Sequence, residues 1–273
     1  MSVPRIKTLL IAALLTINAF FLTLIIIHYY TDTRDERQAI ENTCAILRLN
    51  NIGISPGDIK ASGRLITMRT VRVIDSEAAI AGVFLGQADM TYQGVIYRYE
   101  NKERGTAEFY SAGGFEIKLH DGVITDGDDT LKTVQRLLRD MKLAATPPAM
   151  TVNDENKTVS IINSYKGASI YNCTIDFVFN EGCLRTVGGR YVTDIAPADD
   201  GIVIPNVSTA LLGFLAAVKR GDIDCTLITN VEAGYFYSAA GPSGEGLLTP
   251  VWLITTSDGR FRVDGATGEI RQI

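Results

Sequence analysis

Four aspartates lie close together in the chain, and clustered carboxylates are the side chains that bind calcium in proteins. They are Asp121, Asp126, Asp128 and Asp129, and His120 directly precedes them. Their spacing differs from that of an EF-hand loop, and a solvated turn followed by a helix N-terminus explains the same carboxylates. We therefore expect no metal site in this segment, and we expect His120 to be an ordinary residue of an edge strand.

Two glutamates in the second half of the chain, Glu232 and Glu245, are candidate general acids or bases. The sequence pairs neither of them with a second catalytic group. It also contains no G-x-S-x-G, H-E-x-x-H or Walker motif. We therefore expect a protein that is not an enzyme and holds no cofactor. The aromatic run from Gly234 to Tyr237 is expected in a sheet core, and a platform for stacking a ligand is the alternative.

The composition restricts the class of protein further. The chain has 273 residues, of which 46% are hydrophobic, so it is too apolar to be a disordered tail. With 31 acidic and 26 basic residues its net charge is −5, which argues against nucleic-acid binding. Four cysteines are too few for a disulfide scaffold. We expect buried free thiols, although the sequence leaves the disulfide status open for Cys44, Cys173, Cys183 and Cys225.

The N-terminal region contains the most apolar segment of the chain. From Leu9 to Ile27 there are 19 residues without a charge, and as a helix they would span about 28 Å. This length is close to the roughly 30 Å core of a bilayer. Tyr29 and Tyr30 follow where an interfacial aromatic anchor would lie. The sequence therefore predicts an uncleaved transmembrane signal anchor over residues 9–30, with a buried core helix as the alternative.

The charges beside this segment predict its orientation. Arg5 and Lys7 precede it, and basic residues next to a membrane helix favour the cytoplasmic side. We therefore expect residues 1–8 in the cytoplasm and the chain from residue 31 onwards outside it.

A polar residue near the middle of this helix predicts a contact within the membrane. Asn18 shares one helical stripe with Leu15, Ala19 and Leu22. An amide in lipid is unfavourable unless it is hydrogen-bonded, and such side chains often face another helix. We hypothesise that this stripe contacts a partner helix. The alternative is that Asn18 bonds only a backbone carbonyl one turn back.

The remaining pattern predicts an α+β fold with two lobes of antiparallel sheet, each packed on a helix. The two prolines and the polar run near residue 150 suggest a linker at 146–156, between a first lobe at 31–145 and a second at 157–273. The expected helices are 32–50, 76–84 capped by Ser76, a helix capped by Asp128, and 206–219. The expected strands are 67–74, 90–100, 104–111, 114–119, 157–166, 169–179, 183–194, 225–239, 248–256, 259–264 and 269–272.

The C-terminal end resembles a known family. Its motifs are Pro250-Val-Trp252, Asp258-Gly259 and the run from Asp264 to Ile270, which reads D-G-A-T-G-E-I. Together with the anchor and the segment from Asn51 to Ile54, they resemble the YycH/YycI family, with YycI the better match by length. Members of that family are membrane-anchored regulators of the WalK/WalR two-component system in Gram-positive bacteria. The same ending also occurs in PepSY-type domains.

The resemblance implies a regulatory protein with no catalytic residues. Its implied partners are a sensor histidine kinase and a sister YycH-like regulator, and its implied role is in cell-wall homeostasis. An extracytoplasmic PepSY-like inhibitor or chaperone of a peptidase or cell-wall hydrolase is the alternative. A third reading is a solute-binding or enzymatic protein that uses a cleft between the two halves.

Overall fold

The computed structural model describes most of the chain after residue 33 and a few residues before it. Among these residues, no helix is both long and apolar enough to cross a membrane. Most of the predicted anchor at 9–30 lies outside the described residues, as does the whole of 1–8. The described residues are 14, 17, 18, 20–22, 34–60, 65–111, 113–127, 129–147, 149–152, 156–199, 201–240 and 245–273.

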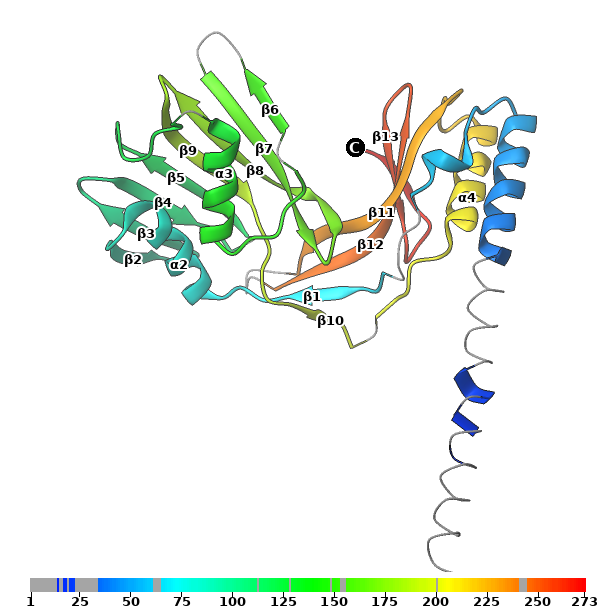
Figure 1. Ribbon diagram of the computed structural model, residues 1–273, viewed down its shortest axis with the longest axis horizontal. Coiled ribbons are helices and arrows are strands. Elements are labelled where there is room, and N and C mark those ends of the chain that lie inside the picture. The colour runs from blue at the N-terminus through cyan, green and yellow to red at the C-terminus, as the bar shows by residue number, and fades with distance from the viewer. Residues whose placement is uncertain are drawn as a thin grey trace, which may run out of the picture.

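The described strands form one mainly antiparallel sheet of 14 strands, and with its helices the fold is α+β, as expected. The strands gather into two lobes (Figure 1). The first lobe contains β2 (Asp89–Gln93), β3 (Ile96–Asn101), β4 (Gly105–Phe109), β5 (Gly114–Leu119), β6 (Ala149–Val152), β7 (Asn156–Tyr165), β8 (Ala168–Asn180), β9 (Cys183–Arg190), α2 (Ile74–Leu85) and α3 (Thr130–Asp140).

One face of the first lobe's sheet is apolar and the other is polar. Along β4, buried residues alternate with half-buried ones, which is the pattern of a sheet with a single core face. The helices α2 and α3 cover that core face. Val134, Leu137 and Leu138 form the buried stripe of α3, as its spacing predicts.

The second lobe takes its residues from both ends of the described chain. A helix over residues 34–49 packs beside α4 (Figure 1), and the two helices share a core with the strands of this lobe. The other elements are the 3-10 helix η1 (Pro56–Asp58), β1 (Met68–Thr70), β10 (Ile195–Pro197), α4 (Val207–Arg220), β11 (Ile228–Ala239), β12 (Gly246–Thr256), β13 (Arg260–Asp264) and β14 (Ile270–Gln272).

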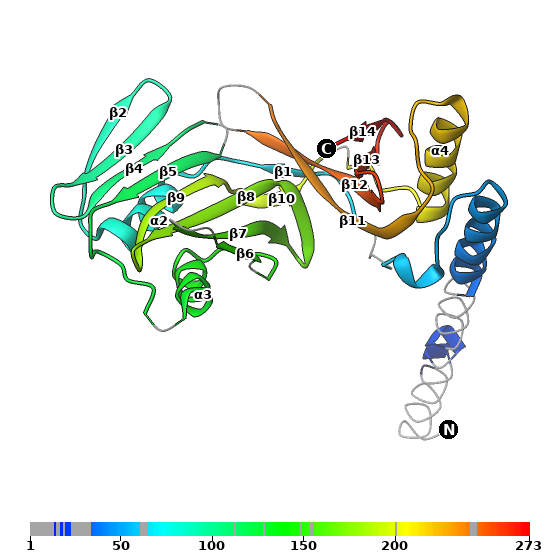
Figure 2. The ribbon, with the colours of Figure 1, turned by 90° about the horizontal axis from the view of Figure 1, so that it is seen from above.

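A long hairpin made by β11 and β12 joins the two lobes (Figures 1 and 2). β11 pairs with β8 in parallel at Tyr235 and Ile170. Beside this pair, the carboxamide of Asn172 donates to the carbonyl of Tyr237 at 2.7 Å and accepts from its N–H at 2.8 Å. The strands cross closely here, because a Cβ on Gly234 would lie 2.5 Å from the backbone oxygen of Ser169.

The division of the chain into lobes differs from the expected one. The expected second lobe begins at 157, but β9 pairs with β5, so 157–190 belong to the first lobe. The expected linker at 146–156 is part of the same lobe, because Thr146 donates to Ile162 at 2.9 Å and β6 pairs with β7. The lobe boundary could not be predicted because local composition does not encode pairing between distant segments. The linker was wrong because a strand at the margin of a sheet can contain the same prolines and polar residues as a linker.

Two helix starts were also placed wrongly. α2 begins at Ile74 after Val73, before the expected cap at Ser76. α3 is capped by Asp129, whose carboxylate accepts from the N–H groups of Leu131 and Lys132, while Asp128 lies outside the described residues. Adjacent residues of the same type offer the same cap, and the sequence alone does not separate them.

The start and end of α4 were predicted closely. Asn206 caps its first turn by accepting from the N–H of Thr209 at 2.8 Å. Gly221 ends it with a left-handed φ of 80°. The four cysteines Cys44, Cys173, Cys183 and Cys225 are free thiols, and Cys183 alone among them is not fully buried. Burial raises the pKa of Cys173 to about 12, so its thiol stays protonated at neutral pH.

Candidate functional site

The predicted membrane contact is only partly within the described residues. Asn18 and Leu22 are helical and exposed, whereas Leu15 and Ala19 lie outside the described residues. The contact of this stripe with a partner helix stays a prediction.

The aspartates of the acidic segment have separate structural partners. Asp126 is buried, accepts from Thr130 Oγ1 at 3.2 Å and pairs with Lys157 Nζ at 3.0 Å. Asp121 pairs with Arg185, and Asp129 caps α3. Within the described residues, no group of three or more histidine, cysteine or acidic side chains converges in a way that could hold a metal ion.

The candidate acid and base residues also lie apart from one another. Glu232 pairs with Lys60 at 2.8 Å on β11, whereas Glu245 precedes β12 and His120 follows β5. His120 is exposed, and its backbone N–H donates to the carbonyl of Arg104 at 2.9 Å. In the aromatic run after Gly234, Tyr235 and Tyr237 are only 3% and 4% exposed. The structure therefore supports the interpretation of this run as sheet core.

The open edge of the first lobe exposes apolar side chains beside unpaired backbone groups. Among the described strands, β2 pairs only with β3, so one side of its backbone faces solvent. All five residues of β2 are exposed, including Met90 at 53% and Tyr92 at 59%. Val95, in the turn that follows, is 51% exposed. Natural edge strands usually carry lysine, proline or a bulge that prevents pairing with another chain. β2 contains neither lysine nor proline.

Met90 and Tyr92 continue the core face of the sheet to this edge. The register places Tyr92 beside Tyr97, Tyr97 beside Phe109, and Phe109 beside Phe115. The Tyr92 and Tyr97 rings are 4.8 Å apart, and those of Phe109 and Phe115 are 5.9 Å apart. We call these four residues the aromatic row. Phe109 and Phe115 are buried in the lobe, Tyr97 is half-buried, and Tyr92 is exposed on β2.

Arg72 supports this edge from the connection between β1 and α2. Its guanidinium donates to the carbonyl of Val95 at 3.0 Å and lies 4.9 Å from the centre of the Tyr97 ring. The same group makes two hydrogen bonds to Glu77, at 2.6 and 3.0 Å. Burial raises the pKa of Glu77, and the hydrogen bond and charge of Arg72 oppose that shift. A buried ion pair therefore holds the turn between β2 and β3 in place.

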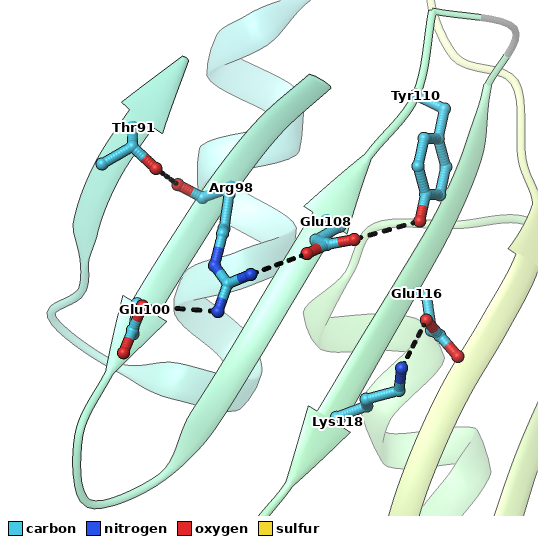
Figure 3. A network of polar contacts seen from close by, with 7 residues as sticks. All are labelled: Thr91, Arg98, Glu100, Glu108, Tyr110, Glu116 and Lys118. Atoms are coloured by element: carbon cyan, nitrogen blue, oxygen red, sulfur yellow. Dashed lines mark hydrogen bonds and ion pairs between the residues drawn. The ribbon is translucent and has the colours of Figure 1, made fainter. Parts of the chain in front are cut away.

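The opposite face of the same strands is polar (Figure 3). Arg98 pairs with Glu108 at 3.0 Å and with Glu100 at 3.5 Å, and Lys118 pairs with Glu116 at 2.9 Å. The hydroxyl of Tyr110 donates to Glu108 at 3.1 Å, and burial together with this bond raises the pKa of Tyr110. A strand added beside β2 would therefore extend a sheet that has an apolar row on one face and, beyond the polar residues of β2, ion pairs on the other.

This edge was not expected, because the sequence predicts a single strand over residues 90–100. Gly94, with a φ of 67°, turns the chain between Gln93 and Ile96 and makes two strands from it. A glycine inside an alternating run was the available signal. It marks the hairpin that exposes Met90 and Tyr92.

No protein-family profile and no curated protein sequence matches this chain. The fold is similar to that of an uncharacterized protein from Eubacterium rectale ATCC 33656, with a TM-score of 0.46 and 10% identity over 81% of this chain and 84% of that one. It is also similar to the C-terminal domain of Bacillus megaterium YpeB, with a TM-score of 0.35 and 13% identity over 75% of this chain and 99% of that one. Both TM-scores are below 0.5, so neither similarity indicates a function for this chain. The function is therefore inferred from the residues of this chain.

Proposed function

We propose that this chain is a membrane-anchored extracytoplasmic protein that binds another protein and regulates it without catalysing a reaction. The observation that carries this proposal is the aromatic row, which runs from the core of the first lobe to the unpaired edge of β2. Exposed apolar side chains beside free backbone donors and acceptors are the features that bind an extended segment of a partner.

The two faces of the β2 edge indicate which residue types the partner segment contains. A strand beside β2 places its alternate side chains on opposite faces of the sheet. Those on the core face would pack on Met90 and Tyr92, and those on the other face would lie beside Asp89, Thr91 and Gln93. The partner segment therefore alternates apolar with polar or charged residues over about five positions.

The first candidate partner is a peptidase or cell-wall hydrolase, which this protein would inhibit or assist in folding as PepSY-type domains do. The second candidate is a sensor histidine kinase together with a sister regulator, as the YycI-like sequence features imply. The C-terminal motifs have structural roles here: a Cβ on Gly265 would lie 2.4 Å from the carbonyl oxygen of Pro250, and Trp252 is 5% exposed. These roles serve either candidate, so an experiment must choose between them.

Site-specific photocrosslinking in living cells tests the proposal. A photoreactive residue at Met90 should crosslink to one partner, and the same residue at Lys142, an exposed position after α3, should not. Recovery of a peptidase or hydrolase supports the first candidate, and recovery of a histidine kinase supports the second. Equal crosslinking from both positions would exclude β2 as the binding edge.

A pair of matched substitutions separates binding from stability. Tyr92→Lys adds a charge to an exposed edge and should reduce the crosslinked product at Met90 at least fivefold, while the melting temperature stays within about 2 °C. Leu49→Lys makes the same kind of change at a side chain that is 84% exposed on the N-terminal helix, and should leave crosslinking unchanged. A loss of crosslinking in both variants would mean that β2 is not the specific contact.

The proposed topology has its own test. Protease added to intact protoplasts should digest the chain after residue 31, and a tag placed before residue 8 should be protected. Protection of the large domain would refute the extracytoplasmic location.

The proposed contact within the membrane is tested at Asn18. Asn18→Leu keeps the segment apolar and removes the amide, so the anchor should still insert. Association with the partner, measured by crosslinking, should fall if Asn18 faces the partner helix. Undiminished association would leave residues 9–30 as an anchor only.

A further inference from the structure

A cavity of about 590 Å³ lies where the two lobes meet. It is formed by the turn between β7 and β8, by the residues that lead into β1, and by the middle of β11. Most of its apolar lining belongs to the small cluster that joins the lobes, and Leu65 and Ala233 also pack on the core of the second lobe. Sites for small ligands commonly have volumes of about 300–1,000 Å³ and often lie between domains.

The inner wall of this cavity is apolar. Half-buried Leu65, Ile66 and Ala233 present most of its apolar surface, whereas Met68 and Tyr235, each 3% exposed, contribute little of it. Such a wall accepts a hydrocarbon or aromatic group.

The mouth of the cavity carries an excess of positive charge. Lys60 and Glu232 lie there and neutralise each other at 2.8 Å. Lys166 is also at the mouth, 5.3 Å from the centre of the Tyr165 ring. Among the described residues, no carboxylate forms an ion pair with Lys166. Within the part of the chain that the structure describes, the cavity therefore combines an apolar wall with an ammonium group that no carboxylate neutralises.

The position of Lys166 comes from an uncommon turn. β7 and β8 are joined by two residues, Lys166 and Gly167, with φ values of 49° and 85°. Two positive φ values in a two-residue hairpin define a type I′ turn, in which asparagine or glycine is the usual first residue. Lysine adopts this positive φ less readily than asparagine or glycine does. At this position it places a cationic side chain at the mouth of the cavity.

We propose that this cavity binds a small carboxylate with an apolar body, and that Lys166 is the residue that favours the anion. The hydrocarbon or aromatic part packs on Leu65, Ile66 and Ala233, and the carboxylate lies at the mouth near Lys166. This binding site is separate from the β2 edge, so it does not depend on the partner protein proposed above.

Three probes of nearly equal shape test the charge preference. They are 4-phenylbutanoate, 4-phenylbutanamide and 4-phenylbutylamine, measured by equilibrium dialysis against the full chain in a neutral detergent and against the same detergent without protein. The carboxylate should bind one molecule per chain, about threefold to tenfold more tightly than the amide, and the amine should bind most weakly. Equal affinity for all three probes would refute the role of charge.

Two lysines in the same backbone conformation give a matched pair of variants. Lys166→Asn removes the ammonium group and supplies the residue that a type I′ turn prefers, so the hairpin should be retained. Lys142, with a φ of 56°, lies after α3 and does not line the cavity, so Lys142→Asn is the control. Lys166→Asn should weaken binding of 4-phenylbutanoate about threefold to tenfold and abolish its preference over the amide. The control should bind as the unaltered chain does.

A substitution that fills the cavity tests its location. Ala233→Phe should weaken binding of all three probes at least tenfold, because the ring occupies the space along the wall. If this variant does not fold, Ala168→Leu reduces the same space from the β8 side. Unchanged binding in a folded variant, or equal effects of Lys166→Asn and Lys142→Asn, would overturn the proposal.

Discussion

The two lobes share one sheet but differ in how the chain builds them. The first lobe uses one continuous stretch, from β2 to β9, in which most neighbouring strands are also neighbours in sequence. In the second lobe, helix 34–49 packs with α4, β11 and β13, so its core joins residues about 200 positions apart. The first lobe gathers most of its exposed apolar side chains at one open edge, whereas those of the second lobe, such as Leu49, Leu212 and Leu227, are spread over separate elements. The candidate binding edge therefore belongs to the lobe whose structure is mainly local.

The largest expected effect on stability is at Trp252, which lies in the core of the second lobe. Its side chain is 5% exposed, and its indole N–H donates to the carbonyl of Pro205 at 2.9 Å. Trp252→Ala should lower the free energy of unfolding by about 3–5 kcal/mol, as loss of a large buried aromatic does. Hydrogen exchange should accelerate in helix 34–49, because this helix shares the core with Trp252. Unchanged exchange there would mean that the N-terminal helix is independent of the second lobe.

A control for this prediction lies on the same lobe. Leu212 is 42% exposed on α4, and Leu212→Ala should change the free energy of unfolding by about 0.5 kcal/mol or less. A comparable loss in both variants would show that Trp252 does not have a special role.

The next prediction compares the stability lost when an ion pair is broken on the first lobe with that lost on the second. Arg72 and Glu77 are 12% and 4% exposed, so Glu77→Ala leaves a buried guanidinium without its partner. We expect a loss of about 3–5 kcal/mol in urea denaturation. The pair between Lys60 and Glu232 is largely exposed, so Glu232→Ala should cost less than about 1 kcal/mol. Similar costs would contradict the difference in burial between the two pairs.

The caps of α4 and α3, Asn206 and Asp129, should make smaller contributions to stability that differ in their dependence on pH. Asn206→Ala should cost about 1 kcal/mol at any pH, because an amide cap does not titrate. The pKa of Asp129 is lowered from 3.8 by hydrogen bonds from the backbone and side chain of Lys132. Its stabilisation is present above pH 3.8 and is lost as the pH falls through the lowered value in the folded state.

The measurement for the caps is the melting temperature between pH 2 and pH 7. Asp129→Asn should remove part of the acid destabilisation of the unaltered chain, and Asn206→Ala should leave that pH dependence unchanged. An identical pH dependence in all three proteins would show that Asp129 does not contribute to it.

The smallest expected effects are at two residues that the sequence offered as candidates for chemistry. Glu245→Gln and His120→Ala should leave both stability and regulatory output nearly unchanged, because the two side chains lie on different lobes and share no partner among the described residues. Loss of output without loss of fold in either variant would make a ligand or catalytic site the better explanation.

The features that could be predicted from sequence are those with a local cause. The buried stripe of α3, the glycine that ends α4 and the alternation of the C-terminal strands depend on residues close to one another in the chain. The lobe boundary could not be predicted, because β5 meets β9 only through an antiparallel pairing across about 70 residues. The edge at β2 was missed for a local reason, since Gly94 was read as part of a strand. A cleft between two halves was one alternative from the sequence, but the residues that line the cavity could not be predicted, because they come from separate segments of the chain.

The second lobe is built from segments that lie far apart in the chain. During translation it can therefore assemble only after the last of these segments has been synthesised. The ribosome releases the first lobe's segments in sequence, and all its strands are available once Arg190 has emerged. Helix 34–49 is made before them, yet its partners on β11 and β13 are synthesised last. The apolar side of that helix, with Cys44 and Leu47, therefore stays without its native cover until nearly the whole chain exists. A chain truncated before β11 would retain the segments of the first lobe and leave this N-terminal helix exposed to chaperones and proteases.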